Sequence, residues 1–210
     1  MNHPISEQMD ADDSLYAVTE HAKAVGMLCM YWSTLEYVVG IAVEKLLDTD
    51  VETAAVMLST SRDISQKCEI LRRLAHHRIK DEALKEWRHY YLGIFDVIQN
   101  VLAARRNRYV HDDWNQVEDR IIQYNRTIKL NRPEAGADKR LVFSVESHSK
   151  PEDIWALTEI IIKTFVCLTL MSEQLRIFWK FGVALTIPQQ AIEVCKLNPQ
   201  WKRLDGSEEN

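Results

Sequence analysis

Glycine is scarce in this chain, with six residues in 210, and none of them forms the glycine-rich loop that holds phosphates in nucleotide-binding enzymes. The chain also lacks a Ser-His-Asp arrangement, and no cysteine has a neighbouring base in sequence. These absences leave nucleotide-binding and acyl-transfer enzymes poorly supported. No internal repeat or low-complexity linker is present, which favours a single domain.

Disulfide and secretion signals are missing as well. The four cysteines are widely scattered, with no C-x-x-C spacing among them, and no secretory apolar region opens the chain. We therefore expect reduced thiols, a cytoplasmic location and no structural disulfide. The cysteines are Cys29, Cys68, Cys167 and Cys195.

Metal-binding patterns are not found either. The adjacent His76 and His77 would diverge by about 100° on a helix, so they cannot easily chelate one ion. Asp112 and Asp113 resemble the start of a calcium site, but no glycine-bearing loop or further carboxylate spacing follows them. We expect no metal and no other cofactor.

Long hydrophobic runs are limited to one segment, Ile160 to Met171. Lys163 interrupts this run, and Glu159 and Glu173 bracket it. The run is too short to span a bilayer, so it predicts a buried helix and no membrane insertion.

The charge of the chain restricts its partners. The formal net charge is -5, so the field of the whole molecule repels nucleic acid, and RNA binding would need a local basic patch. The candidates for such a patch are Arg105, Arg106 and Arg108, joined by Arg120, Arg126, Lys129, Arg132, Lys139 and Arg140.

Apolar residues recur at three- and four-residue steps through most of the chain, which predicts a mainly α protein. The clearest stripe lies on the first long helix and contains Leu28, Trp32, Leu35, Val39, Ala42 and Leu46. Residues 1–13 are polar and lack this period, so they are interpreted as a flexible tail. Helices are expected over 14–47, 51–58, 63–78, 81–106, 151–181 and 189–196.

The period changes after the fourth long helix. Alternating apolar residues over 122–130 and 141–145 predict two strands, joined by a polar segment. They form a β-hairpin inserted at about 119–146, before the last long helix. We expect one domain over 14–187, which includes this hairpin, and a C-terminal extension over 188–210.

The segment Arg106-Asn107-Arg108-Tyr109-Val110-His111 stands where the helix over 81–106 is expected to end. Arginine and histidine together supply a phosphate clamp and a proton-transfer group, which is what cleavage of an RNA phosphodiester without a metal requires. Five helical steps rotate by about 500°, so the two side chains would point about 140° apart on one helix. They converge if the helix ends before His111, or if a second subunit brings its own pair across a two-fold axis.

This R-N-x-x-x-H pattern in a helical chain resembles the HEPN superfamily, over roughly Leu15 to His111 and the last helix from Pro151. The resemblance implies an up-and-down helical bundle and a homodimer with a composite active site. It implies that His111 is the general acid or base and that Arg106 stabilises the phosphorane. Asn107 would either orient the phosphate or hold the imidazole tautomer. Cleavage would leave a 2′,3′-cyclic phosphate and a 5′-hydroxyl without a metal. The superfamily includes toxins restrained by antitoxin proteins, anti-phage effectors, and members with no demonstrated catalysis.

Glu36 and Trp114 each permit two interpretations. Glu36, in a W-x-x-L-E arrangement, either pairs with Arg106 or His111 in the site or forms a solvated ion pair at the helix boundary. Trp114 either stacks on a base of bound RNA or packs between the helix end and the hairpin, which is the more frequent role.

Two functional hypotheses follow. The first is a dimeric, metal-independent endoribonuclease of a toxin–antitoxin, anti-phage or stress system, with Arg105 and Arg108 binding substrate and Arg106 and His111 facing an open cleft. The second is a non-catalytic helical module that binds RNA, a nucleotide or a protein. In the second, Arg106 and its neighbours stabilise the negative end of the helix dipole, and His111 is buried as a C-terminal cap of the helix. The last helix would then serve dimerisation, through Ile160, Ile161, Phe165, Leu168 and Met171.

Overall fold

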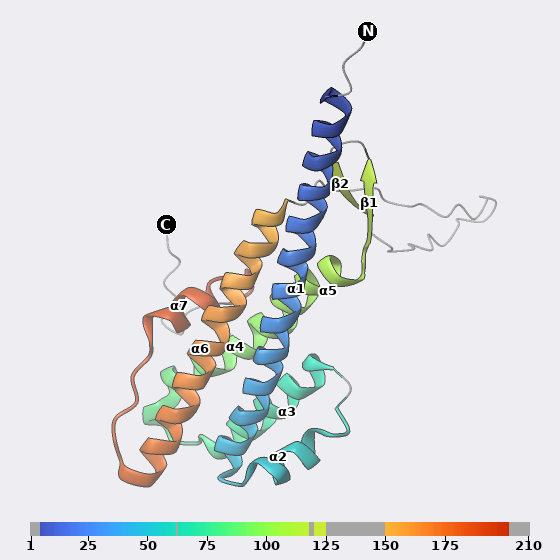
Figure 1. Cartoon of the computed structure of the whole chain (residues 1–210). Coiled ribbons are helices and arrows are strands. Elements are labelled where there is room, and N and C mark those ends of the chain that lie inside the picture. The colour runs from blue at the N-terminus through green and yellow to red at the C-terminus, as the bar shows by residue number, and fades with distance from the viewer. Residues whose placement is uncertain (1–4, 62, 118–119, 125–149, 202–210) are drawn as a thin grey trace, which may run out of the picture. The chain divides into compact units, whose positions relative to one another are not determined.

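The computed structural model describes residues 5–61, 63–117, 120–124 and 150–201, and this part of the chain is mainly helical (Figure 1). A 3-10 turn over Glu82–Leu84 precedes α4, and a π-helical segment over Ile98–Leu102 joins α4 to α5. The elements are α1 (Ile5–Leu47), α2 (Val51–Leu58), α3 (Ile64–Arg78), α4 (Lys85–Val97), α5 (Ala103–His111), β1 (Asp113–Val117), β2 (Arg120–Tyr124), α6 (Pro151–Phe181) and α7 (Gln189–Cys195). The prediction of a mainly α chain is confirmed.

The described chain divides into two compact units. Unit 1 comprises Met1–Cys29 and Arg106–Ala156, and unit 2 comprises Met30–Arg105 and Leu157–Asn210. Helices α1, α5 and α6 contribute residues to both units. The single domain expected over 14–187 stays a prediction.

The first helix is longer than its apolar pattern predicts. It begins at Ile5, whereas the sequence predicts a tail up to residue 13 and a helix from Ser14. The segment 6–13 contains no proline or glycine, so nothing in it breaks a helix. A missing apolar period therefore does not mark the end of a helix.

The predicted apolar stripe of α1 is buried. Trp32 is 4% exposed, and Leu28, Leu35, Val39, Ala42 and Leu46 are fully buried. Capping follows the sequence as well. Asp50 accepts a hydrogen bond from the backbone N–H of Thr53 at 2.8 Å, and Asp63 accepts one from Gln66 at 2.9 Å. Each carboxylate satisfies a donor that the first turn leaves without a helical partner.

The expected helix over 81–106 is not one regular helix. The five residues of the π segment widen one turn, and the Ala103 N–H donates to the Ile98 carbonyl. A hydrogen bond that spans five residues places Ile98 above Ala103, and both side chains are buried. The wider turn therefore keeps apolar residues inward where a regular α-helix would rotate one of them outward.

The C-terminal segment packs on α4 within unit 2. Helix α7 confirms the short helix predicted over 189–196 and lies beside α4 (Figure 1). The Cys195 thiol donates to the Tyr90 carbonyl at 3.5 Å, and the Trp201 ring stacks on His89 at a centroid distance of 5.3 Å. Gly93 permits this approach, because a Cβ atom there would lie 2.7 Å from Cys195 Sγ and 2.9 Å from Trp201 Nε1.

We expect Gly93→Ala to destabilise the protein by about 1–3 kcal/mol, since a rigid ring and a short thiol leave the new methyl group no room. Helix propensity alone would favour alanine by about 1 kcal/mol. Gly40→Ala is the matched control, because its Cβ would meet only Leu58 Cδ1, at 3.9 Å. Urea denaturation followed by circular dichroism measures both variants. Equal or increased stability of Gly93→Ala would contradict the close packing of α7 on α4.

The described strands β1 and β2 pair antiparallel, with Asp113 opposite Tyr124 and Val117 opposite Arg120. The strand β1 was not predicted, because its sequence is polar and lacks a clear alternation. Most of the hairpin predicted over 119–146, including its second strand, lies outside the described residues.

All four cysteines are free thiols in this structure. Cys29 is half-buried, and the other three are buried. Burial raises the pKa of the Cys68 thiol to about 12 and that of Cys167 to about 12. These buried thiols therefore carry little thiolate at neutral pH.

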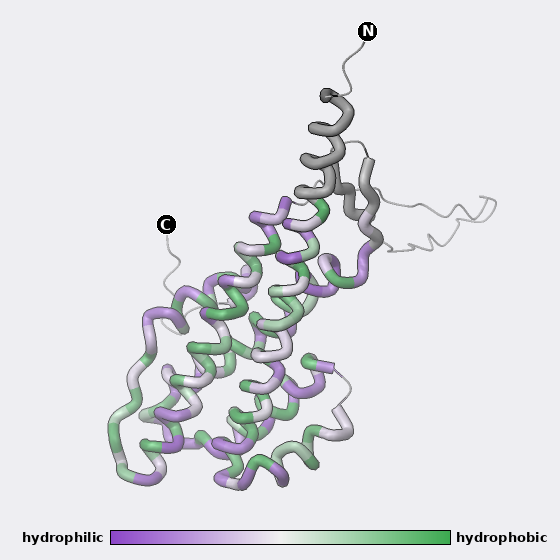
Figure 2. The backbone as a smooth tube through the Cα atoms, viewed as in Figure 1, coloured by the Kyte–Doolittle hydropathy of each residue, from purple (hydrophilic) through white to green (hydrophobic). Residues whose placement is uncertain are grey.

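Two of the described helices are long and apolar enough to cross a membrane by length and composition alone. They are α1 over Val18–Leu47 and α6 over Pro151–Phe181 (Figure 2). Core helices of soluble proteins have the same properties. The apolar run in α6 is short, as the sequence indicates, but the helix that contains it has 31 residues. A cytoplasmic location stays a prediction.

Candidate functional site

Arg106, Asn107 and His111 lie together at the C-terminal end of α5, within unit 1. Arg106 Nη1 donates to Asn107 Oδ1 at 3.1 Å and lies 3.3 Å from His111 Nε2. Asn107 and His111 are exposed, and Arg106 is half-buried. The cluster therefore presents a guanidinium, an amide and an imidazole to solvent at one helix end.

The contact between Arg106 and His111 forms inside one chain, although simple helix geometry points the two side chains apart. His111 is the last residue of α5, so the helix does not end before it. Five residues advance the helix by about 7.5 Å, which the long arginine side chain crosses. Neither a helix break nor a second subunit is needed for these two residues to meet.

The chemistry of this contact fixes the roles of its atoms. A guanidinium only donates hydrogen bonds, so in a hydrogen bond with Arg106 the His111 Nε2 atom is the acceptor. This role requires the neutral tautomer with its ring proton on Nδ1, in which Nε2 carries the lone pair. A phosphate that drew Arg106 away would leave this lone pair beside it.

The two flanking arginines remain available to solvent. Arg105 and Arg108 are both exposed, and the Arg108 carbonyl accepts a hydrogen bond from the Asp112 N–H at 3.1 Å, at the helix end. Positive side chains at this position interact favourably with the negative, C-terminal end of the helix dipole. Substrate binding by Arg105 and Arg108 stays a prediction.

Trp114 packs against the end of α5 and against α1 within unit 1. Its indole Nε1 donates to the Tyr109 carbonyl at 3.0 Å, and its ring stacks on Tyr109 at a centroid distance of 6.4 Å. His21 meets the same ring edge-on at 5.7 Å. This packing matches the structural alternative for Trp114, and stacking on an RNA base stays a prediction. His21 was not identified from the sequence, because its contact depends on the unpredicted strand β1.

We expect Trp114→Ala to loosen the last turn of α5, because it removes both the ring packing and the donor to Tyr109. Trp114→Phe keeps an aromatic ring and removes only the hydrogen bond, which is worth about 1 kcal/mol. Hydrogen exchange of the peptide over 103–112 should therefore accelerate most in Trp114→Ala and less in Trp114→Phe. A peptide from α3 serves as the internal reference. Unchanged exchange in both variants would contradict a role for Trp114 in holding this turn.

Glu36 has its described partners in unit 2. Its Oε1 accepts a hydrogen bond from Trp32 Nε1 at 2.8 Å, and its Oε2 lies 3.8 Å from Lys67 Nζ. This arrangement matches the solvated ion pair at the helix boundary, one of the two alternatives for this residue. Pairing of Glu36 with Arg106 or His111 stays a prediction.

No group of three or more His, Cys, Asp or Glu side chains in the described part of the chain could hold a metal ion. No family model, curated protein or solved structure matches the chain. The chemistry of the α5 end therefore rests on its own residues. A fixed cation beside a proton acceptor can bind an anionic ester and accept a proton from a hydroxyl of the same substrate.

Proposed function

We propose that this protein is a metal-independent endoribonuclease of the HEPN type. The observation that carries the proposal is the 3.3 Å contact between Arg106 Nη1 and the exposed His111 at Nε2. Cleavage of a ribonucleotide phosphodiester needs a base near the 2′-hydroxyl and positive charge near the phosphate. The end of α5 supplies both groups from neighbouring turns.

In the proposed reaction, the Arg106 guanidinium leaves the imidazole and binds the phosphate oxygens, where its planar donors suit a phosphate. His111 Nε2 then accepts the proton of the 2′-hydroxyl. The 2′-oxygen attacks phosphorus, the P–O5′ bond breaks, and the protonated His111 of a second chain gives its proton to the leaving 5′-oxygen. The products are a 2′,3′-cyclic phosphate and a 5′-hydroxyl.

A homodimer would complete this site. One chain contributes one imidazole, whereas attack and departure require a base and an acid at the same time. A second copy across a two-fold axis would bring its own Arg106 and His111 to a composite active site. A cytoplasmic toxin, anti-phage or stress enzyme restrained by an antitoxin protein would fit this chemistry.

The test is the cleavage of a fluorescent single-stranded RNA by the purified protein in excess EDTA, with analysis of the product ends. We expect cleavage, cyclic-phosphate ends, and no cleavage of the same strand when 2′-deoxynucleotides replace the ribonucleotides. Products with 5′-phosphates, or cleavage that requires added Mg²⁺, would refute the proposed mechanism.

The second candidate is a non-catalytic helical module that binds RNA or a protein through the same basic helix end. It is favoured by the donation of Arg106 to Asn107, which also stabilises the end of α5 without any substrate. Two features disagree with this module as the sequence predicts it, with a buried His111 and a dimer formed through the last helix. His111 is exposed, not buried, and Ile161, Leu168 and Met171 are fully buried in unit 2. These three residues are core residues, whereas Ile160 and Phe165 of the same predicted set are half-buried. Dimerisation through α6 stays a prediction.

A further inference from the structure

Helix α2, in unit 2, is apolar but largely uncovered. Six of its eight residues are hydrophobic, yet only Ala54 and Leu58 are buried. Val51 is 56% exposed, Val56 is 71% exposed and Met57 is 42% exposed. Single exposed apolar residues are ordinary, whereas a cluster on one short helix marks a surface that binds another molecule.

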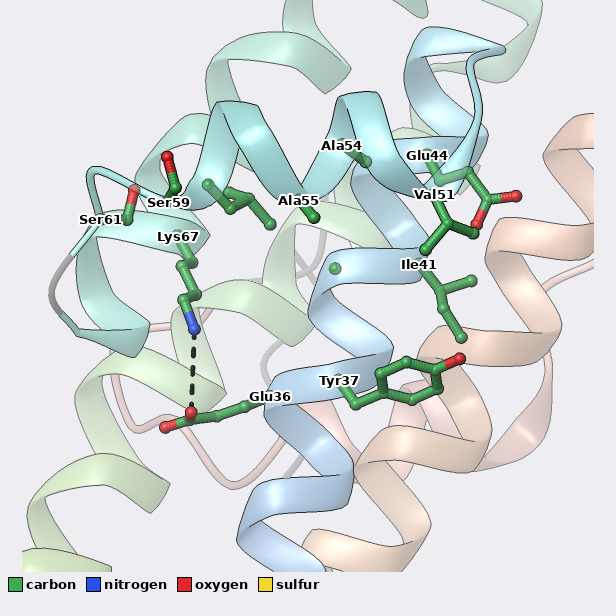
Figure 3. A pocket seen from close by; sticks show the side chains of 12 residues that line it. Glu36, Tyr37, Ile41, Glu44, Val51, Ala54, Ala55, Ser59, Ser61 and Lys67 are labelled. Carbon is green, nitrogen blue, oxygen red and sulfur yellow. Dashed lines mark ion pairs between the residues drawn. The ribbon is translucent and has the colours of Figure 1, made fainter.

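A groove lies between α2, the outer face of α1 and the start of α3 (Figure 3). Its volume is about 420 Å³, within the range of about 300–1,000 Å³ that is usual for binding pockets. The apolar part of the lining comes from Tyr37, Gly40, Ile41, Val51, Ala54, Ala55 and Leu58. Tyr37 is 65% exposed at the edge of the groove, so the exposed apolar surface continues from α2 onto α1.

Besides Tyr37, the polar residues of the lining are two carboxylates, two serines and one lysine, and further carboxylates lie outside the lining. Glu36 and Glu44 line it eight residues apart on α1, and Lys67 faces Glu36 across it (Figure 3). Asp48, Asp50 and Glu52 are exposed where α1 leads into α2. Only Lys45 and Lys67 are positive among residues 36–61 and the groove lining. Lys45 is held by Glu44 at 2.8 Å and Glu173 at 3.3 Å, so five carboxylates meet two ammonium groups, a net charge of -3.

This negative charge favours a basic partner over a second copy of the chain. A second copy of the chain that docked through the same surface would place the two acidic rims against each other, which is unfavourable. A basic partner gains from the same rim. Two carboxylates eight residues apart on a helix are separated by about 12 Å along its axis, which matches two cations about two helical turns apart on a partner helix.

We propose that the groove between α1 and α2 docks an amphipathic helix of a protein partner, with an apolar face that fills the groove and Lys or Arg residues that meet Glu36 and Glu44. This is the helix-in-groove mode of recognition. The inference goes beyond RNA cleavage and does not depend on it. Every residue that carries it belongs to unit 2, whereas Arg106 and His111 belong to unit 1.

The test uses two synthetic helical peptides with the same leucine face. One carries Lys pairs two turns apart at the flanks, and the other carries Glu at the same positions. Fluorescence anisotropy with the full-length protein should give at least about tenfold tighter binding of the cationic peptide, with a preference that weakens as salt rises. Ala55→Arg, at an exposed position of the lining, should abolish binding without loss of helical circular dichroism.

Charge variants distinguish binding through the acidic residues from nonspecific binding of the cationic peptide. Glu36→Gln combined with Glu44→Gln should weaken binding of the cationic peptide several-fold, whereas Glu86→Gln, at an exposed carboxylate on α4 outside the lining, should not. Equal binding of both peptides, no binding of either, or binding unaffected by Ala55→Arg would overturn the proposal. A dimer in light scattering that Ala55→Arg dissociates would assign the surface to a second copy and would equally overturn it.

Discussion

Replacing His111 by alanine should lower the rate of RNA cleavage by about 10²–10⁴-fold, the usual contribution of a general acid or base. The variant removes the Nε2 acceptor and leaves the rest of α5 unchanged, because His111 is exposed and is the last residue of the helix. The loss should therefore appear in kcat, with little change in RNA affinity or in thermal stability. Single-turnover cleavage in EDTA, together with RNA binding by anisotropy, measures the two effects separately.

Arg106 should act differently from its neighbours. Arg106→Lys keeps one positive charge but loses the planar fork, so we expect most of the activity to be lost at this position. Arg108→Ala removes an exposed cation two residues away and is the matched control, with a smaller loss that shows mainly in RNA affinity. The double variant of Arg106 and His111 should be little worse than either single variant, because the two groups act on one transition state. Full activity of His111→Ala would exclude the proposed mechanism.

The helices that could be predicted from the sequence are those whose signals are local. The stripe from Leu28 to Leu46 is periodic and is buried. Asp50 and Asp63 cap α2 and α3, and a short carboxylate directly before an apolar helix is a local signal of such a cap. The short helix α7 was found in the same way, although its packing on α4 was not. That packing depends on the empty space at Gly93, where no local pattern is involved.

The features that escaped prediction depend on residues distant in sequence or on helix irregularity. The π segment lets Ile98 and Ala103 both lie buried, and a sequence pattern based on a uniform helix does not predict such a wider turn. Candidate site residues were found by their chemistry, since Arg106 and His111 were selected as a pair. Their contact was not expected, because a helical projection gives the direction of each Cβ atom and ignores the length of an arginine side chain.

Replacing Phe95 by alanine should destabilise the protein by about 3–5 kcal/mol, which is the usual cost of removing a large aromatic side chain from a core. Phe95 is fully buried in unit 2. Its ring meets Tyr91 edge-on at a centroid distance of 5.0 Å, and Tyr91 in turn stacks on Trp87 at 5.0 Å. Such aromatic pairs add to the stabilisation from burial, so the cavity would disturb three rings on consecutive turns of α4.

The surroundings of Phe95 cannot easily close this cavity. The Tyr91 hydroxyl is tied to the Ser172 hydroxyl at 3.0 Å, and both groups are buried, so Tyr91 cannot shift without breaking a buried hydrogen bond. Phe95→Leu keeps most of the volume and should cost much less than Phe95→Ala. Val56→Ala, at a side chain 71% exposed on α2, should change the stability by less than about 0.5 kcal/mol. Urea denaturation of the three variants measures the series. A loss below about 1 kcal/mol for Phe95→Ala would mean that α4 is not packed as described, because a rigid aromatic core cannot lose a whole ring at so small a cost.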